Sequence, residues 1–87
     1  MCTSITSKLA VSGSAKGAAG WMPVSAAVIS FDHPHHTPLD HALSIDFLNE
    51  AAAPGTRVAV ELSADSARAL ARSIEAALAQ GEAEELI

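Results

Sequence analysis

Four stretches of the chain alternate apolar and polar residues with a period of two. They are residues 3–12, 24–31, 41–49 and 56–62. A period of two places successive side chains on opposite sides of an extended chain, which is typical of β-strands. The second stretch is apolar on both sides, and this favours a central position in a sheet. The pattern therefore predicts four strands.

Short breaks separate these predicted strands. Residues 13–20 hold three glycines among small residues and predict a loop. Residues 32–40 contain Pro34 and Pro38, which lack the N–H group that a sheet ladder needs. Residues 53–55 have the sequence Ala-Pro-Gly, which favours a turn. We therefore expect each strand to follow the previous one in a meander.

The last third of the chain changes to a helical period. Ser63 is a good N-cap residue, and Asp65 follows in the first turn, where the helix dipole favours negative charge. Gly81 is suited to the position just beyond a helix end. Apolar residues recur between them at helical spacing: Ala67, Leu70, Ala71, Ile74, Ala77 and Leu78.

The order of these elements predicts an α+β fold. We expect a four-stranded antiparallel meander sheet followed by one C-terminal helix packed on one face. Residues 1–81 would form a single α+β domain, and residues 82–87 an acidic tail. The 87 residues are too few for a second domain.

The predicted core is thin. Of the chain, 49% is hydrophobic, but much of this fraction is alanine, and aromatic residues make up only 3%. A single helix covers only part of a four-stranded sheet. We therefore expect a homo-oligomer, specifically a homodimer, with a second copy on the sheet face turned away from the helix.

Charge and cysteine content exclude several classes of function. The net charge is −5, and the five basic residues do not form a patch, which argues against nucleic acids and anionic membranes as partners. No signal peptide and no apolar run of membrane-spanning length is visible. The single cysteine allows no intrachain disulfide, which favours the reducing cytoplasm.

All four histidines of the chain fall within one short segment, residues 32–41, here called the histidine-rich turn. They are His33, His35, His36 and His41, flanked by Asp32 and Asp40. Neutral imidazole is a good ligand for transition metals. The leading hypothesis is a small transition-metal-binding protein that uses these histidines, with zinc as the default metal.

The meander adds candidate residues to this site. The first strand begins, and the fourth ends, at the same end of the sheet as the histidine-rich turn. Cys2, Glu61 and the helix start at Ser63 are therefore expected nearby, and Cys2 is a further candidate ligand. His35 and His36 would point to opposite sides of an extended chain, so one of them is expected not to bind.

Other hypotheses remain open. The histidine-rich turn also fits a polar connection that binds nothing. The rival function is a homo-oligomeric interaction or scaffold module without metal or catalysis, and a third is an accessory subunit with a protein partner. An enzyme is not favoured, because so short a chain leaves little room for a substrate pocket.

Three segments together carry a resemblance: Met1-Cys2-Thr3, residues 13–21, and the run from Asp32 to Leu43. They resemble a family of short bacterial proteins of uncharacterised function. The likeness covers nearly the whole chain. It implies a complete protein rather than a fragment, and it implies no activity, substrate or ligand.

Overall fold

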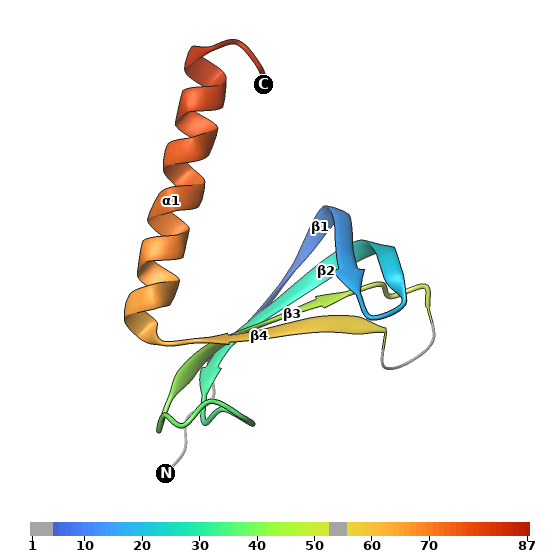
Figure 1. The fold of residues 1–87 in the computed structure, drawn as a ribbon, viewed down its shortest axis with the longest axis vertical. Helices are drawn as coiled ribbons and strands as arrows, with labels where there is room; N and C mark the ends of the chain where they lie inside the picture. Colours follow the sequence, from blue (N-terminus) through green and yellow to red (C-terminus); the bar gives the residue numbers. More distant parts are fainter. Residues whose placement is uncertain (1–4, 53–55) are drawn as a thin grey trace.

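A computed structural model describes residues 5–52 and 56–87 of the chain (Figure 1). It confirms the predicted α+β fold, a four-stranded antiparallel sheet followed by one C-terminal helix. The elements are β1 (Ile5–Gly17), β2 (Gly20–Asp32), β3 (Ala42–Leu48), β4 (Arg57–Leu62) and α1 (Ala64–Ala83). The strands lie in the sheet in chain order, as a meander requires.

The register of the strands gives the sheet two chemically different faces. Opposed residues share a face, and successive residues alternate between faces. Ile29 pairs with Ile45, and Ile45 with Val60, on one side. This side is here called the apolar face and comprises Ile5, Ser7, Leu9, Ala27, Ile29, Phe31, Leu43, Ile45, Phe47, Val58, Val60 and Leu62. The other side, here called the polar face, comprises Thr6, Lys8, Ala10, Ala26, Val28, Ser30, Asp32, Ala42, Ser44, Asp46, Leu48, Arg57, Ala59 and Glu61.

The first hairpin is longer than the sequence predicts. The expected loop at residues 13–20 is wrong: pairing between β1 and β2 continues up to Gly17 opposite Gly20. Only Ala18 and Ala19 form the turn, and Gly20 takes a φ of 112°, which a side chain would resist. Small residues at this end therefore form a paired ribbon rather than an open loop.

A β-bulge separates the two halves of this hairpin. Ala10 pairs with Ala26 and Gly13 with Val24, so β1 contains one more residue than β2 between these pairs. A bulge bends its strand and increases the local twist. Pro23 is tolerated within β2 because only β1 pairs with this half of the strand, and the other edge needs no N–H donor there.

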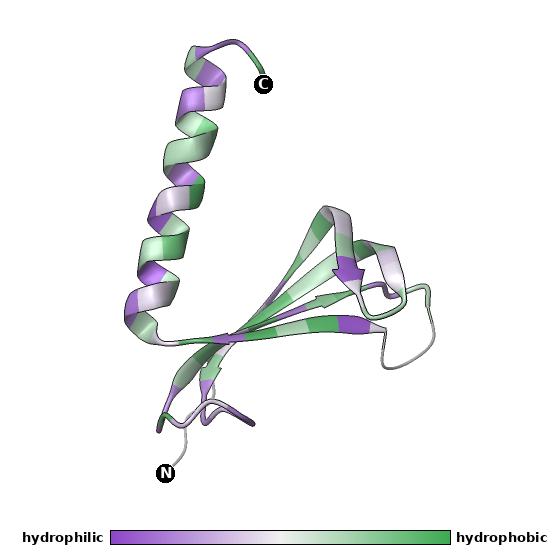
Figure 2. Ribbon diagram, viewed as in Figure 1, coloured by the Kyte–Doolittle hydropathy of each residue, from purple (hydrophilic) through white to green (hydrophobic). Residues whose placement is uncertain are grey.

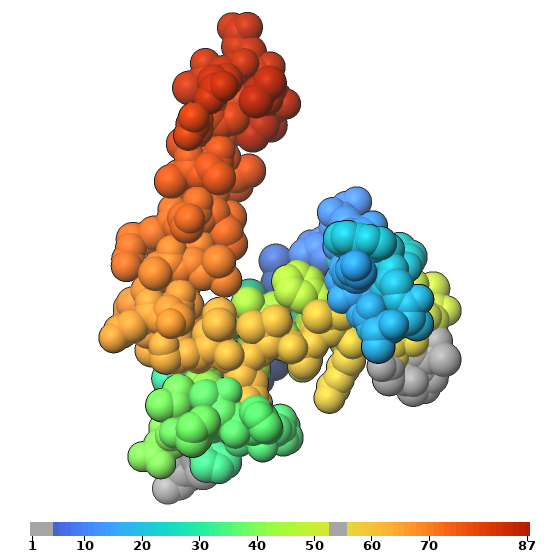
Figure 3. Space-filling view, in the orientation of Figure 1, coloured from blue at the N-terminus to red at the C-terminus, as the bar shows by residue number. Residues whose placement is uncertain are grey.

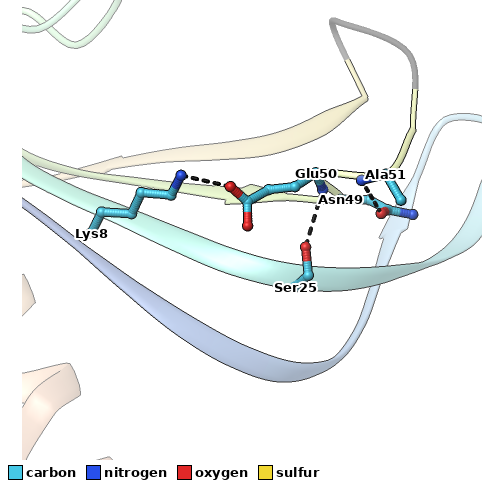
Figure 4. A network of polar contacts seen from close by, with 5 residues as sticks. All are labelled: Lys8, Ser25, Asn49, Glu50 and Ala51. Carbon is cyan, nitrogen blue, oxygen red and sulfur yellow. Dashed lines mark hydrogen bonds and ion pairs between the residues drawn. The ribbon is translucent and has the colours of Figure 1, made fainter.

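Polar contacts fix the segment after β3 against the hairpin (Figure 4). Lys8 Nζ lies 2.6 Å from Glu50 Oε2, and the backbone N–H of Glu50 donates to Ser25 Oγ at 3.0 Å. The N–H of Ala51 donates to Asn49 Oδ1 at 3.1 Å. These contacts link three strands at the end of the sheet opposite the histidine-rich turn.

The start of α1 lies where the sequence predicts it, but its end does not. Ser63 is the N-cap, and its Oγ accepts the N–H of Ser66 at 3.2 Å. The expected stop at Gly81 is wrong, since the helix continues to Ala83. It ends in a Schellman motif in which the Leu86 N–H donates to the Gly81 carbonyl at 2.8 Å and Glu85 takes a φ of 60°.

The helix rises away from the sheet instead of lying along it (Figures 1 and 3). Its base contacts β3, and none of its twenty residues is buried. The apolar stripe of α1 is open to solvent: Leu70 is 44%, Ile74 51% and Leu78 48% exposed. Apolar bands follow α1 along most of its length (Figure 2).

The buried core is correspondingly small. Among the described residues, the buried apolar side chains are Val24, Ala26, Ala27 and Ala42. Three of the four are alanines, which remove little apolar area from water. A thin core was expected from the composition, and the open position of α1 makes it thinner still.

Candidate functional site

The histidine-rich turn lies against the end of the polar face and is held there by Glu61 of β4. The Glu61 carboxylate accepts the backbone N–H groups of His35 at 2.7 Å, His36 at 3.2 Å and Thr37 at 2.8 Å. It also accepts the Thr37 hydroxyl at 2.9 Å. One carboxylate thus orders three consecutive residues of the turn.

These hydrogen bonds favour the ionised form of Glu61. Donation from the Thr37 and His35 backbone N–H groups lowers the pKa of Glu61 from its ordinary value of 4.5 to about 2. Partial desolvation opposes this, but the hydrogen bonds dominate. Glu61 therefore stays ionised at pH values well below neutral, and its negative charge favours the observed conformation of the turn.

His33 is oriented by the backbone of the same turn. Its Nδ1 lies 3.1 Å from the carbonyl oxygen of Asp40. A carbonyl only accepts hydrogen bonds, so Nδ1 is the protonated nitrogen in this contact. In neutral His33 the unprotonated nitrogen is then Nε2. The backbone N–H of His33 donates to Asp32 Oδ1 at 2.7 Å, which further fixes the start of the turn.

His41 is held in a different way. Its ring stacks on Phe31, with 5.7 Å between ring centroids and 14° between the ring planes. Phe31 belongs to the apolar face. His41 is thus separated from the other three histidines by its packing, although it is their neighbour in sequence.

A cleft of about 590 Å³ lies beside the histidine-rich turn and is here called the histidine cleft. His33, His35 and His36 line it, whereas His41 does not. Its other lining residues are Ser30, Asp32, Thr37, Ser44, Asp46, Arg57, Ala59, Val60 and Glu61. Arg57 Nη1 lies 3.9 Å from Asp46 Oδ2 within it.

The histidine cleft brings together part of the predicted site. Within residues 5–52 and 56–87, no group of three or more His, Cys, Asp or Glu residues is arranged to hold a metal ion. Cys2 lies outside the described residues. The expectation that Glu61 reaches the histidines is met, but through their backbone rather than their rings.

A second feature is an apolar groove between α1 and the sheet, with a volume of about 370 Å³. We call it the helix–sheet groove. The sheet contributes Ile29, Leu43, Ile45 and Leu62, and the helix contributes Ala67, Arg68, Leu70, Ala71 and Ile74. The sequence pattern indicated both apolar surfaces, but periodicity contains no information on the angle between them.

The chain belongs to a family of unknown function, DUF6295, which it matches over residues 1–87. No curated protein and no solved structure matches the chain. Within the part of the chain that the structure describes, no helix is both long and apolar enough to cross a membrane. The geometry of the two sites therefore has to support any functional proposal.

Proposed function

We propose that this member of the DUF6295 family is an interaction module that assembles with a second copy of itself through its open apolar surface. The observation that supports this proposal is the exposure of the α1 stripe, where Leu70, Ile74 and Leu78 are each close to half exposed. Contiguous apolar surface of this kind usually marks an interaction site.

The total surface area supports the same proposal. The chain exposes 6594 Å². A compact monomer of 8.9 kDa exposes about 4,800 Å². The excess of about 1,800 Å² exceeds the roughly 800 Å² that each partner buries in a standard protein–protein interface. Burying part of this excess would bring the chain closer to the surface area of an ordinary folded protein.

The overall extent of the chain leads to the same conclusion. Its radius of gyration is 14.8 Å, compared with about 12 Å for a compact domain of this length. Most of the stability of helices in proteins comes from packing of their apolar side rather than from intrinsic propensity. A partner on the α1 stripe would supply that packing.

The proposed interface is not on the sheet face that the sequence favours. The polar face carries the Lys8–Glu50 and Arg57–Asp46 ion pairs, and the histidine-rich turn covers one end of it. Charged groups are depleted in the centres of stable interfaces. The apolar face together with α1 is the better surface for a second copy.

Light scattering coupled to size exclusion tests the proposal. Ile74→Glu places a charge in the middle of the α1 stripe, and we expect it to convert a dimer into a monomer. Ala76→Glu makes the same change on the opposite side of α1 and should leave the dimer intact. A parent protein that is monomeric at all concentrations would contradict the proposal, whichever variant is studied.

A second candidate function is transition-metal binding in the histidine cleft, with zinc as the default metal. The supporting observation is the hydrogen bond from His33 Nδ1 to the Asp40 carbonyl. Metal-binding histidines commonly donate one ring nitrogen to a carbonyl or carboxylate and bind the metal through the other. His35 and His36 line the same cleft and are further candidate ligands. The single cysteine of the chain fits a location in the reducing cytoplasm.

Metal analysis of untagged protein tests this second function. A bound ion stabilises the folded state by mass action, so chelator should lower the Tm of the parent. His33→Ala should abolish both the bound zinc and the effect of chelator. His41→Ala is the matched control, because His41 packs on Phe31 outside the cleft. Protein without metal, and with a Tm that chelator does not change, would exclude this function.

A further inference from the structure

We infer that the helix–sheet groove is filled by helix α1 of a second copy, and that the two helices pair antiparallel about a twofold axis at Ile74. This inference rests on the proposed self-association and specifies its geometry. It follows from the apolar lining of the groove, from the pattern of residue sizes along α1 and from the charges at its two ends.

The lining of the groove suits an apolar occupant. One wall is the apolar face of the sheet, and the other is the stripe of α1. An amphipathic helix offers an apolar side to such walls, and neighbouring helices pack with their axes about 8–10 Å apart. The chain itself supplies such a helix in α1, whose stripe is largely exposed and, among residues 5–52 and 56–87, is unpartnered along most of its length.

The pattern of large and small residues along the α1 stripe is symmetric about Ile74. At equal distances on either side, Leu70 corresponds to Leu78, Ala71 to Ala77, and Ala67 to Gly81. An antiparallel twofold pair places such residues at the same level of the two helices. Large residues then meet at three levels, the Ile74 pair and a Leu70–Leu78 pair on each side of it. Small residues meet at the other levels, so that the backbones can approach closely there.

Twofold pairing covers both open apolar surfaces at once. When the helix of one copy enters the groove of the other, symmetry places the second helix in the first groove. Each stripe and each apolar sheet face then gains a partner. Pairing through the outer edges of β1 or β4 would leave these surfaces exposed, so it is the less favourable mode of association.

Charge agrees with the antiparallel direction. Arg68, in the first half of α1, lines the helix–sheet groove. Glu82 and Glu84 lie at the other end of the helix and are exposed. Antiparallel pairing brings the acidic end of one helix towards Arg68 of the other. A parallel pair would place like charges side by side.

Disulfide cross-linking tests the geometry. In a Cys2→Ser background, Ile74→Cys places its thiol on the predicted axis, and we expect it to oxidise to a covalent dimer. Leu78→Cys alone should not cross-link, because residue 78 lies four residues from the axis in each copy. The two residues 78 of the dimer are then about 12 Å apart along the helix direction. A disulfide needs Cα atoms within about 7 Å. An equimolar mixture of Leu70→Cys and Leu78→Cys should form the mixed dimer, identified by intact mass.

Two controls distinguish this inference from the proposed function. Ala76→Cys, on the opposite side of α1, should cross-link at least about tenfold more slowly than Ile74→Cys, since only the predicted contact raises the effective thiol concentration.

Light scattering on each reduced variant reports whether a dimer exists. A dimer in which Ile74→Cys does not cross-link would overturn the antiparallel pairing and leave self-association standing. A dimer in which Leu78→Cys cross-links with itself as fast as Ile74→Cys would indicate parallel helices. Monomeric protein would overturn both.

Discussion

Glu61 determines the conformation of the histidine-rich turn. Its carboxylate accepts hydrogen bonds from three consecutive backbone N–H groups and one hydroxyl. Pro34 and Pro38 keep this segment out of the sheet, so these N–H groups find their acceptor in Glu61 rather than in a neighbouring strand. If the turn binds a ligand, Glu61 positions His35 and His36 through their backbone N–H groups. The sequence suggested that Glu61 lies nearby, but it could not show that the turn donates its backbone to it.

The hydrogen bonds to Glu61 predict a specific pH dependence. The pKa is lowered in the folded state, so the ionised carboxylate stabilises the fold fully above its ordinary value of 4.5. This contribution is lost as the pH falls from 4.5 through about 2. We expect Glu61→Gln to lower the Tm at pH 7, and the difference from the parent to shrink towards pH 2.

Thermal unfolding followed by circular dichroism at a series of pH values measures this difference. Glu75→Gln removes the same charge from an exposed position of α1 and controls for charge alone. A Tm difference between parent and Glu61→Gln that is equal at pH 7 and pH 2 would show that the carboxylate charge is not what orders the turn.

At the scale of elements, the sequence predicted most of the fold because period and cap signals are local. Strands β2, β3 and β4 lie within a few residues of their predicted bounds, and the N-cap at Ser63 is confirmed. The far half of the first hairpin was missed because glycine and small residues are a loop signal in sequence, whereas the pairing with β2 that makes this segment a strand is a tertiary contact. The helix end was missed because the left-handed position is taken by Glu85 and not by Gly81.

The first hairpin offers a test of its turn geometry. Gly20→Ala places a side chain on a residue with a φ of 112°, and we expect a loss of about 1 kcal/mol in the free energy of unfolding. Gly13→Ala is the matched control, because a Cβ at Gly13 meets no atom within 4 Å and its φ is ordinary. Urea unfolding compares the two variants. Equal effects would mean that Gly20 does not require its positive φ.

The helix start offers a second test. Ser63→Ala removes the acceptor for the Ser66 N–H, and we expect it to destabilise the protein by about 1 kcal/mol. Ser63→Asp keeps an acceptor at the N-cap and should retain most of the stability. Both are measured by urea unfolding with helical ellipticity as the signal. A Ser63→Ala variant as stable as the parent would show that α1 is fixed by packing alone.

At the scale of the whole molecule, the decisive feature is the angle between α1 and the sheet. Both apolar surfaces could be predicted, since Leu70, Ile74 and Val60 follow plain periodic patterns. Their mutual orientation could not, because it depends on contacts that are far apart in the sequence. For the same reason, the histidines could be named from composition, but the separation of His41 from the histidine cleft could not.

Self-association predicts that stability depends on protein concentration. When the folded dimer unfolds to two free chains, dilution favours the unfolded state, so the Tm should rise as the concentration of protein rises. Differential scanning calorimetry over a hundredfold range of concentration measures this. The Ile74→Glu variant, which lacks the contact on the α1 stripe, should show a lower Tm that does not change with concentration.

The most direct test of the central claim is sedimentation equilibrium of the unmodified protein, because it gives the molar mass without assuming a shape. The account predicts a mass of twice 8.9 kDa, with dissociation only on dilution. A mass of 8.9 kDa at every concentration would contradict it, since the apolar face and the α1 stripe would then remain open to water in solution.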